Sequence, residues 1–330
     1  MKLLSMKKYW MLGATAVLAL SLAACGDKEK GSTEKAEVEA ESTEASADGL
    51  DTEQTITYLG EDYVVPSKVN NIVAASLESM EDAAILGIKP VGVLAIADAI
   101  PTYLADELEG AALVGDKFAP NNEAILNLNP DVILGSSKHG KEVVTALNKI
   151  QTMIPYSHVS TNWKENLTLL GQLGDKEAEA EKIITDYEEK AGQAKAELGE
   201  ALKDKEALVL RIRKGSINAY PESIYFNPVL YNDLGLKVPD VVAKAEAQSE
   251  LSLEALAESN PDYIFLQFET SENTDNAAAL DELLANPIFG SIEAAKNEQV
   301  FVNVVDPLAQ GGTAWSKVKF LDAAIENLSK

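Results

Sequence analysis

The sequence predicts an α/β protein of two Rossmann-like lobes with mostly parallel sheets, joined by a single long α-helix. Three observations predict this fold class. Strand and helix signals alternate along the chain, one helical pattern runs unbroken from Asp175 to Leu202, and a motif of the first half recurs in the second. The chain has 330 residues, of which 46% are hydrophobic, and this size suits two ordinary domains.

The stretch from Asp175 to Leu202 has the pattern of one amphipathic helix. Its apolar residues recur at steps of three and four and therefore share one stripe, while Glu, Lys and Gln fill the other face. No proline interrupts it, and Gly192 and Gly199 are its only weak positions. At about 1.5 Å per residue it spans roughly 40 Å, so we expect it to join the lobes. The stripe comprises Ala180, Ile183, Ile184, Tyr187, Ala191, Ala194, Leu198 and Leu202.

The other elements alternate in the way that is typical of parallel sheets covered by helices. Two short β-type runs around Gly60-Glu61-Asp62 predict a hairpin. Predicted strands are 56–58, 63–65, 72–75, 91–94, 132–134, 207–213, 263–268 and 300–305, and predicted helices are 77–86, 141–149, 228–234, 276–285 and 316–328. We therefore place an N-terminal lobe at 53–174, the interlobe helix at 175–203 and a C-terminal lobe at 204–330.

A repeat supports two related lobes. The segment Asn122–Ile133 is followed 131 residues later by Leu253–Ile264. Each copy has a Glu, a short helical run, Asn-Pro-Asp and an apolar strand signal, and a chance helix–turn–strand would not keep all four spacings. Glu123 and Glu254 each open a helix, where the helix dipole favours a carboxylate. A matched pair, one per lobe, also suits docking on a partner at two points.

The N-terminus has the features of a processing segment rather than of a fold. Three lysines precede an apolar run at 9–20 that is too short to span a membrane. Leu22-Ala23-Ala24-Cys25 then resembles a bacterial lipoprotein box, and Cys25 is the only cysteine of the chain. Residues 1–24 are therefore predicted to be a signal peptide, Cys25 a lipidation site, and the polar segment 25–52 a disordered tether. Together they predict a body anchored by lipid at the extracytoplasmic face of a cell membrane, on a Gram-positive cell surface.

The charge balance excludes a general nucleic-acid binder, because the net charge is −25 and phosphate binding needs an excess of Lys and Arg. Any anion site must be a local exception, and Arg211 and Arg213 are the only arginines. In the predicted strand 207–213 they face the same way, near the carboxyl end where α/β sheets bind ligands. Arg bonds carboxylate and phosphate groups with two donors at once. Ion pairing at an exposed strand end is the alternative explanation for the pair.

The loop Gly135–Lys141 follows a strand and precedes a helix, as a phosphate-binding loop does. Glu142 stands where such a loop needs Ser or Thr, so we reject nucleotide binding. Lys138 or His139 can still face a cleft, although a solvated loop charge explains either residue equally well. The chain has only two histidines and no second cysteine, so no cluster has metal-ligand spacing and no protein metal site or cofactor is expected. No nucleophile motif such as Gly-x-Ser-x-Gly is present, so no enzyme activity is expected.

Several motifs in this order resemble the binding proteins of iron–siderophore ABC transporters, which have two lobes joined by a rigid helix. The resemblance covers about Val69 to Leu328 and departs at Met153–Tyr156, where many relatives carry an Ala-Pro-Thr strand. The motifs are Leu86–Gly92, Asn122–Ile133, Trp163–Leu167, Arg211-Ile212-Arg213, Ser252-Leu253-Glu254 and Gly311–Lys317.

The resemblance implies capture of a ligand without chemistry. Basic and aromatic residues between the lobes would hold a ferric siderophore, and by position these are Arg211, Arg213, Lys138, Tyr220 and Trp315. Glu123 and Glu254 would meet the permease subunits. Two arginines suit a dianionic chelate, and this favours a citrate-based or hydroxamate siderophore as the ligand. The alternatives are cobalamin or haem on the same scaffold, and a surface α/β hydrolase.

Overall fold

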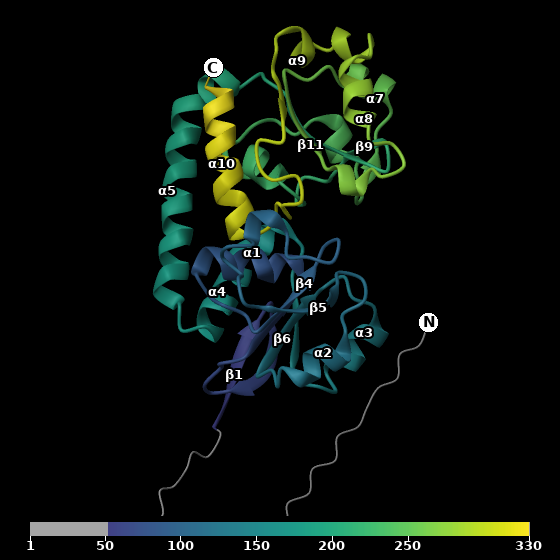
Figure 1. Ribbon diagram of the computed structural model, residues 1–330. Coiled ribbons are helices and arrows are strands. Elements are labelled where there is room, and N and C mark those ends of the chain that lie inside the picture. The colour runs from purple at the N-terminus through teal and green to yellow at the C-terminus, as the bar shows by residue number, and fades with distance from the viewer. Residues whose placement is uncertain (1–51, 330) are drawn as a thin grey trace, which may run out of the picture. The chain divides into compact units, whose positions relative to one another are not determined.

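The computed structural model describes residues 52–329. The predicted signal peptide, the lipidation site Cys25 and all of the predicted tether except Thr52 lie outside this range. Within it, two α/β lobes are linked by helix α5 (Glu177–Leu202), as the sequence predicts (Figure 1). No helix of the described residues is both long and apolar enough to cross a membrane.

The N-terminal lobe has a five-stranded sheet in the order β5-β4-β3-β6-β7, and all its pairs are parallel. Its strands are β3 (Ile72–Ala75), β4 (Gly92–Ala95), β5 (Ala112–Asp116), β6 (Val132–Ser136) and β7 (Met153–Tyr156). The chain winds outward from β3 on one side and from β6 on the other. The order therefore reverses between these two strands, and a crevice opens there at their carboxyl ends.

Helices and a hairpin complete this lobe. The antiparallel hairpin of β1 (Glu53–Tyr58) and β2 (Glu61–Pro66) confirms the predicted one. The helices are α1 (Leu77–Leu86), η1 (Thr102–Leu104), α2 (Asn122–Asn127), α3 (Lys141–Leu147), η2 (Ser160–Asn162) and α4 (Trp163–Leu173). Ser76 caps α1, and Gly87 ends it in a left-handed conformation that suits glycine.

The C-terminal lobe has a mixed sheet in the order β10-β9-β8-β11-β12. Strands β8, β11 and β12 are parallel, and β9 and β10 are added antiparallel at one edge. The strands are β8 (Ala207–Arg213), β9 (Ser216–Ala219), β10 (Ser249–Glu250), β11 (Tyr263–Phe268) and β12 (Val300–Val302). The helices are η3 (Val229–Asp233), α6 (Asp240–Ala243), α7 (Leu253–Ser259), η4 (Thr270–Glu272), α8 (Ala279–Leu284), η5 (Phe289–Ser291), α9 (Glu293–Lys296) and α10 (Ala314–Leu328).

Helix α5 is not the only connection between the lobes. The last helix, α10, packs along it and also contacts α1 and α4 of the N-terminal lobe (Figure 1). The predicted stripe of α5 is buried at Ala180, Tyr187, Ala191, Ala194 and Leu202. Small alanines on this stripe let neighbouring helices approach closely. The lobes are thus joined by two packed helices, which the sequence did not predict.

The start of α10 is fixed to α1 by two buried carboxylates, which we call the acidic clamp. Glu81 accepts hydrogen bonds from the Ser316 hydroxyl at 2.6 Å and the Gln310 amide at 2.8 Å, and also from Thr313, the N-cap of α10. Asp82 accepts a hydrogen bond from the Ala314 amide at 2.8 Å. Both carboxylates therefore satisfy donors at a helix N-terminus that would otherwise be unpaired.

The Asn and the Asp of the repeat have a structural explanation. Asn129 and Asn260 both have φ of 46°, a left-handed conformation that Asn tolerates. Asp131 accepts from the Asn71 amide at 2.8 Å just before β3, and Asp262 accepts from the Glu206 amide at 2.9 Å just before β8. In each lobe the Asp thus fixes the start of the first strand of the five-stranded sheet.

The structure differs from the predicted elements in a few places. The predicted helix 228–234 is a π-helix, η3, and the last strand ends at Val302 rather than at 305. The short strands β5, β7, β9 and β10 and the helix α4 were not assigned from the sequence. The strands β5, β7 and β10 lie at sheet edges, where only one neighbour constrains them and the apolar pattern is short.

Candidate functional site

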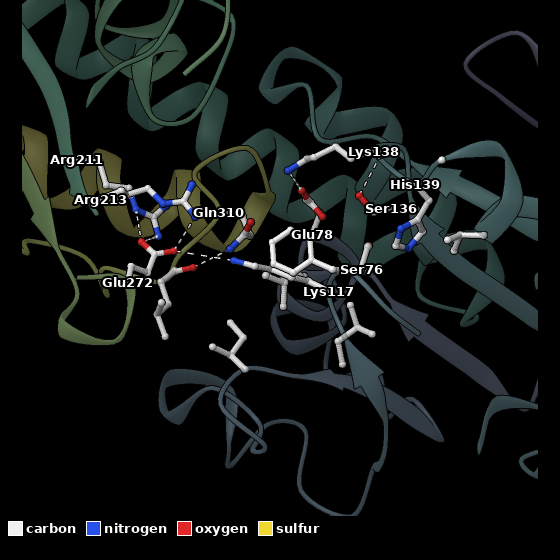
Figure 2. Close-up of a pocket in the computed structure, with 17 residues that line it drawn as sticks. Ser76, Glu78, Lys117, Ser136, Lys138, His139, Arg211, Arg213, Glu272 and Gln310 are labelled. Atoms are coloured by element: carbon white, nitrogen blue, oxygen red, sulfur yellow. Dashed lines mark hydrogen bonds and ion pairs between the residues drawn. The ribbon is translucent and has the colours of Figure 1, made fainter. Parts of the chain in front are cut away.

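The candidate site is a cavity of about 350 Å³ between the lobes, which we call the interlobe cavity. The N-terminal lobe contributes residues at the carboxyl ends of β3, β4, β5 and β6. The C-terminal lobe contributes Arg211 and Arg213 at the carboxyl end of β8 and Glu272 after β11 (Figure 2). The cavity therefore lies at the place where open α/β sheets bind ligands. Its polar lining consists of Ser76, Glu78, Lys117, Ser136, Lys138, His139, Arg211, Arg213, Glu272 and Gln310.

A second cavity of about 370 Å³ adjoins the first and shares Glu78, Lys138, Arg211, Arg213 and Gln310 with it. It extends toward the C-terminal lobe. Its other lining residues are His158, Tyr220, Ile224, Tyr225, Glu246, Ala247 and Gln248. A ligand that fills both cavities would contact the same shared cations from two sides.

Arg211 is the most enclosed cation of the site, with only 7% of its surface exposed. Its Nε and Nη2 lie 3.0 and 2.7 Å from Oε2 of Glu272, and its guanidinium lies over the Tyr225 ring at 5.5 Å. Burial alone would lower the pKa of Arg211, but the Tyr225 and Glu272 side chains raise it above its ordinary value. Arg211 therefore stays charged inside the protein.

Arg213 and Lys117 complete a cluster of three cations around one carboxylate. Arg213 places Nη2 at 3.2 Å from Oε1 of Glu272 and donates from Nη1 to Gln248 at 2.7 Å. Lys117 extends from the other lobe to 4.0 Å from the same oxygen (Figure 2). Burial lowers the pKa of Lys117, and the Glu272 carboxylate opposes this shift.

The N-terminal lobe carries the other charged pair. Lys138 Nζ lies 3.1 Å from Glu78, whose side chain is 5% exposed, whereas that of Lys138 is 55% exposed. Burial lowers the pKa of His139, and burial together with the nearby Lys138 lowers that of His158. Both rings are therefore neutral near pH 7, and lysine and arginine supply the positive charge.

The structure brings together four of the five predicted ligand residues. Arg211, Arg213 and Lys138 line both cavities, and Tyr220 lines the second, where its hydroxyl lies 3.2 Å from Gln248. Trp315 is not among the residues that line either cavity. Its ring packs on Tyr103 with centroids 4.9 Å apart.

Glu123 and Glu254 lie away from the cavities, exposed in the first turns of α2 and α7. The caps of these helices are Asn121, which accepts from the Glu123 amide at 3.1 Å, and Ser252, which accepts from the Ala255 amide at 3.1 Å. The capping residues therefore satisfy the helix ends, and the two glutamates are not needed for that purpose. Their role in docking stays a prediction.

Sequence reasoning missed Lys117, Glu78 and Glu272. Lys117 follows β5, an edge strand that was not assigned, and Glu272 follows β11, where an acidic residue attracts no attention in an acidic chain. The available signals were the position of Lys117 directly after a strand and that of Glu78 in the first turn of a helix, whereas Glu272, the last residue of η4, offered no such signal. Among residues 52–329, no group of three or more His, Cys, Asp and Glu side chains is placed to hold a metal ion.

Comparison with known proteins agrees with this geometry. A family model for periplasmic binding proteins matches residues 72–303. An iron-uptake system-binding protein of Bacillus subtilis (strain 168) is 46% identical over 327 residues, which cover 98% of this chain and 100% of the relative. YfiY, a probable siderophore-binding lipoprotein of the same strain, is 27% identical over 88% of this chain and 89% of its own length.

Solved structures give the same result. The triscatecholate siderophore-binding protein FeuA of Bacillus subtilis, complexed with ferri-bacillibactin, is 48% identical to this chain. The match has a TM-score of 0.80 and covers 84% of this chain and 98% of FeuA. Fold, cavity position and sequence all lead to one conclusion: this chain belongs to the periplasmic binding protein family.

Proposed function

We propose that this protein captures a ferric siderophore in the interlobe cavity and delivers it to an ABC permease for iron uptake. The observation that carries the proposal is the cluster of Lys117, Lys138, Arg211 and Arg213 around one cavity. In a chain with a net charge of −25, four cations facing one cavity are a local exception that suits an anionic ligand. The similarity to siderophore-binding proteins supports the same function.

The siderophore we propose is a tris-catecholate. Three doubly deprotonated catecholates around one ferric ion give a trianion, which suits four cations better than a ligand of lower charge. The 48% identical relative is described as a triscatecholate siderophore-binding protein. The two arginines alone suggested a citrate-based or hydroxamate ligand, but Lys117 enlarges the positive cluster, and we therefore prefer the catecholate class.

Binding needs no chemical step. Arg guanidiniums donate to catecholate oxygens in pairs, and Lys ammonium groups add charge without a fixed direction. Phe118 is 78% exposed where it lines the interlobe cavity, and its ring can pack against an aromatic catecholate. Because α5 and α10 brace the lobes together, we expect small lobe motions on binding rather than wide closure.

The location that we propose in the cell rests on Cys25, and the proposed contact with the permease rests on two exposed glutamates. We propose that Cys25 carries the lipid anchor and holds the body at the extracytoplasmic face of the membrane. The relative YfiY, described as a lipoprotein, supports this location. Glu123 and Glu254, one on each lobe, would then contact the two permease subunits.

A panel of ferric chelates tests the ligand class. Purified protein is titrated with ferri-bacillibactin, a ferric hydroxamate, ferric citrate, haem and cobalamin, while tryptophan fluorescence is followed. We expect the tris-catecholate to bind most tightly, with the hydroxamate and citrate complexes weaker. A fluorescence change with haem or cobalamin alone would contradict the proposed function, and so would the absence of a change with all five ligands.

A further inference from the structure

Glu272 occupies the place where the negative charge of a ligand is expected. Its side chain is only 11% exposed, and its carboxylate lies among two arginines and a lysine. Both Oε atoms are engaged, Oε2 by Arg211 and Oε1 by Arg213. An incoming anion therefore meets a cation cluster that already has a counter-ion supplied by the protein.

Some of the donors of the two arginines are already in use. Arg211 uses Nε and Nη2 on Glu272, and Arg213 uses Nη2 on Glu272 and Nη1 on Gln248. Paired donation to a ligand from the Nε–Nη2 edge of Arg211, the kind of contact that gives arginine its advantage at anion sites, thus requires its contact with Glu272 to break. A carboxylate left beside a bound trianion would also repel it strongly in a site sheltered from water.

The backbone of Glu272 is fixed, so the side chain is the part that can leave. Its carbonyl accepts from the Lys214 amide at 3.1 Å. The next residue, Asn273, is fully buried and donates to the Ile212 and Glu269 carbonyls at 3.0 and 2.8 Å, while its Oδ1 accepts from the Gly215 amide at 3.0 Å. Rotation about the side-chain bonds of Glu272 moves the carboxylate without disturbing this anchor.

We propose that Glu272 is an internal counter-anion, which a ferric siderophore must displace from Arg211 and Arg213 in order to bind. Anions of lower charge, such as acetate or phosphate, cannot replace it favourably, whereas a trianion can. The carboxylate thus makes the site selective for highly charged ligands and lowers the affinity for all of them. This inference rests on the proposed function and names the residue that sets its specificity.

The test compares wild type with Glu272→Gln by isothermal titration with ferri-bacillibactin, with and without millimolar phosphate. Gln keeps an oxygen that can accept from the guanidiniums but removes the charge. We expect the variant to bind about tenfold or more tightly and to be inhibited by phosphate, while wild type is not. Glu250→Gln is the matched control, because Glu250 lies on β10 in the sheet of the C-terminal lobe, outside both cavities. We expect this control to bind ferri-bacillibactin with the affinity of wild type.

The outcomes separate this inference from the proposed function. If wild type binds ferri-bacillibactin and Glu272→Gln binds it equally or more weakly, the counter-anion is refuted while siderophore capture stands. If wild type binds no ferric siderophore, both are refuted. A crystal structure of the wild-type complex gives an answer even if the variant does not fold: we expect Glu272 beyond hydrogen-bond distance of Arg211, and an intact ion pair would refute its displacement.

Discussion

Charged side chains buried near the lobe junction are each held by a specific partner. Arg211 is paired with Glu272 in the lining of the interlobe cavity, and Lys317 of α10 is paired with Asp233 of η3. Lys317 is 1% exposed, and its ammonium lies 2.7 Å from Asp233 and 5.1 Å from the Tyr187 ring centroid. Burial lowers the pKa of Lys317, and Asp233 opposes that shift. Such a pair contributes little net stability, but breaking it is costly.

Replacing Lys317 tests this statement. We expect Lys317→Met to lower the free energy of unfolding by about 3 kcal/mol, because Asp233 is left without its cation. Urea denaturation measures the change. The control Lys319→Met removes an exposed lysine of the same helix, and we expect a change within about 0.5 kcal/mol. Equal losses in the two variants would show that the buried pair has no special role.

At the scale of elements, the connection between the lobes depends on α10 as much as on α5. The acidic clamp holds the start of α10 to α1 without a basic partner among its hydrogen bonds. Burial raises the pKa of Glu81 to about 6, although four hydrogen bonds lower it, and burial raises that of Asp82 to about 8, with Tyr156 and Ala314 opposing. Ionisation of the clamp is therefore unfavourable in the folded protein.

The clamp predicts a pH dependence of stability. Both folded pKa values lie above those of the unfolded chain, near 4, so the contribution is complete below about pH 4 and is lost as pH rises through about 6 and 8. We expect the melting temperature of wild type to fall between pH 5 and pH 8, and Asp82→Asn to reduce this fall by roughly 3 °C or more. Calorimetry at several pH values measures it, and parallel curves for the two proteins would refute the assignment.

The length and continuity of α5 predict a second effect. Ala191 lies buried in the middle of this helix, so Ala191→Pro removes a backbone hydrogen bond and bends the helix, at a cost of about 3 kcal/mol. Delivery to the permease should then fail in an uptake assay even where ferric-siderophore binding persists. Normal uptake with Ala191→Pro would show that lobe spacing does not matter.

The neighbouring residue Gly192 is exposed, and there is open space where the Cβ of an alanine would lie. Gly192→Ala should therefore raise the free energy of unfolding of the protein by roughly 0.5–1 kcal/mol.

At the scale of the whole molecule, the sequence predicts those features that depend on local periodicity. The stripe of α5, the shared direction of Arg211 and Arg213, and the position of β11 all follow from patterns of 3.6 or two residues. The acidic clamp could not be predicted in this way. Glu81 and Asp82 read as polar residues on a solvated helix face, and they are buried because α10 arrives from more than 200 residues later in the chain.

The site was predicted only in part for the same reason. Arg211 lies near the carboxyl end of a recognisable strand and Lys138 follows another, and the rule that ligands bind at carboxyl ends finds both. Glu272 is part of the site because a short helical turn after β11 places it between cations of both lobes. Trp315 was transferred by resemblance alone, and packing against Tyr103 places it outside both cavities.

Two carboxylates on different lobes predict how the protein would dock on the proposed permease. We expect the double variant Glu123→Ala/Glu254→Ala to bind ferric siderophore normally, because both residues lie outside the cavities, while uptake of radioactive iron falls to roughly a tenth or less. The matched control Glu142→Ala/Glu258→Ala removes one exposed carboxylate from each lobe and should leave uptake unchanged. Equal uptake by both double variants would refute docking through this pair.

Capture of a ferric siderophore by the cation cluster is the central claim, and one measurement tests it most directly. Isothermal titration of wild type and of Arg211→Ala/Arg213→Ala with ferri-bacillibactin gives stoichiometry and affinity together. We predict one site per chain in wild type and an affinity at least about 100-fold weaker in the double variant. No binding by wild type, or equal affinity in a correctly folded double variant, would contradict the account.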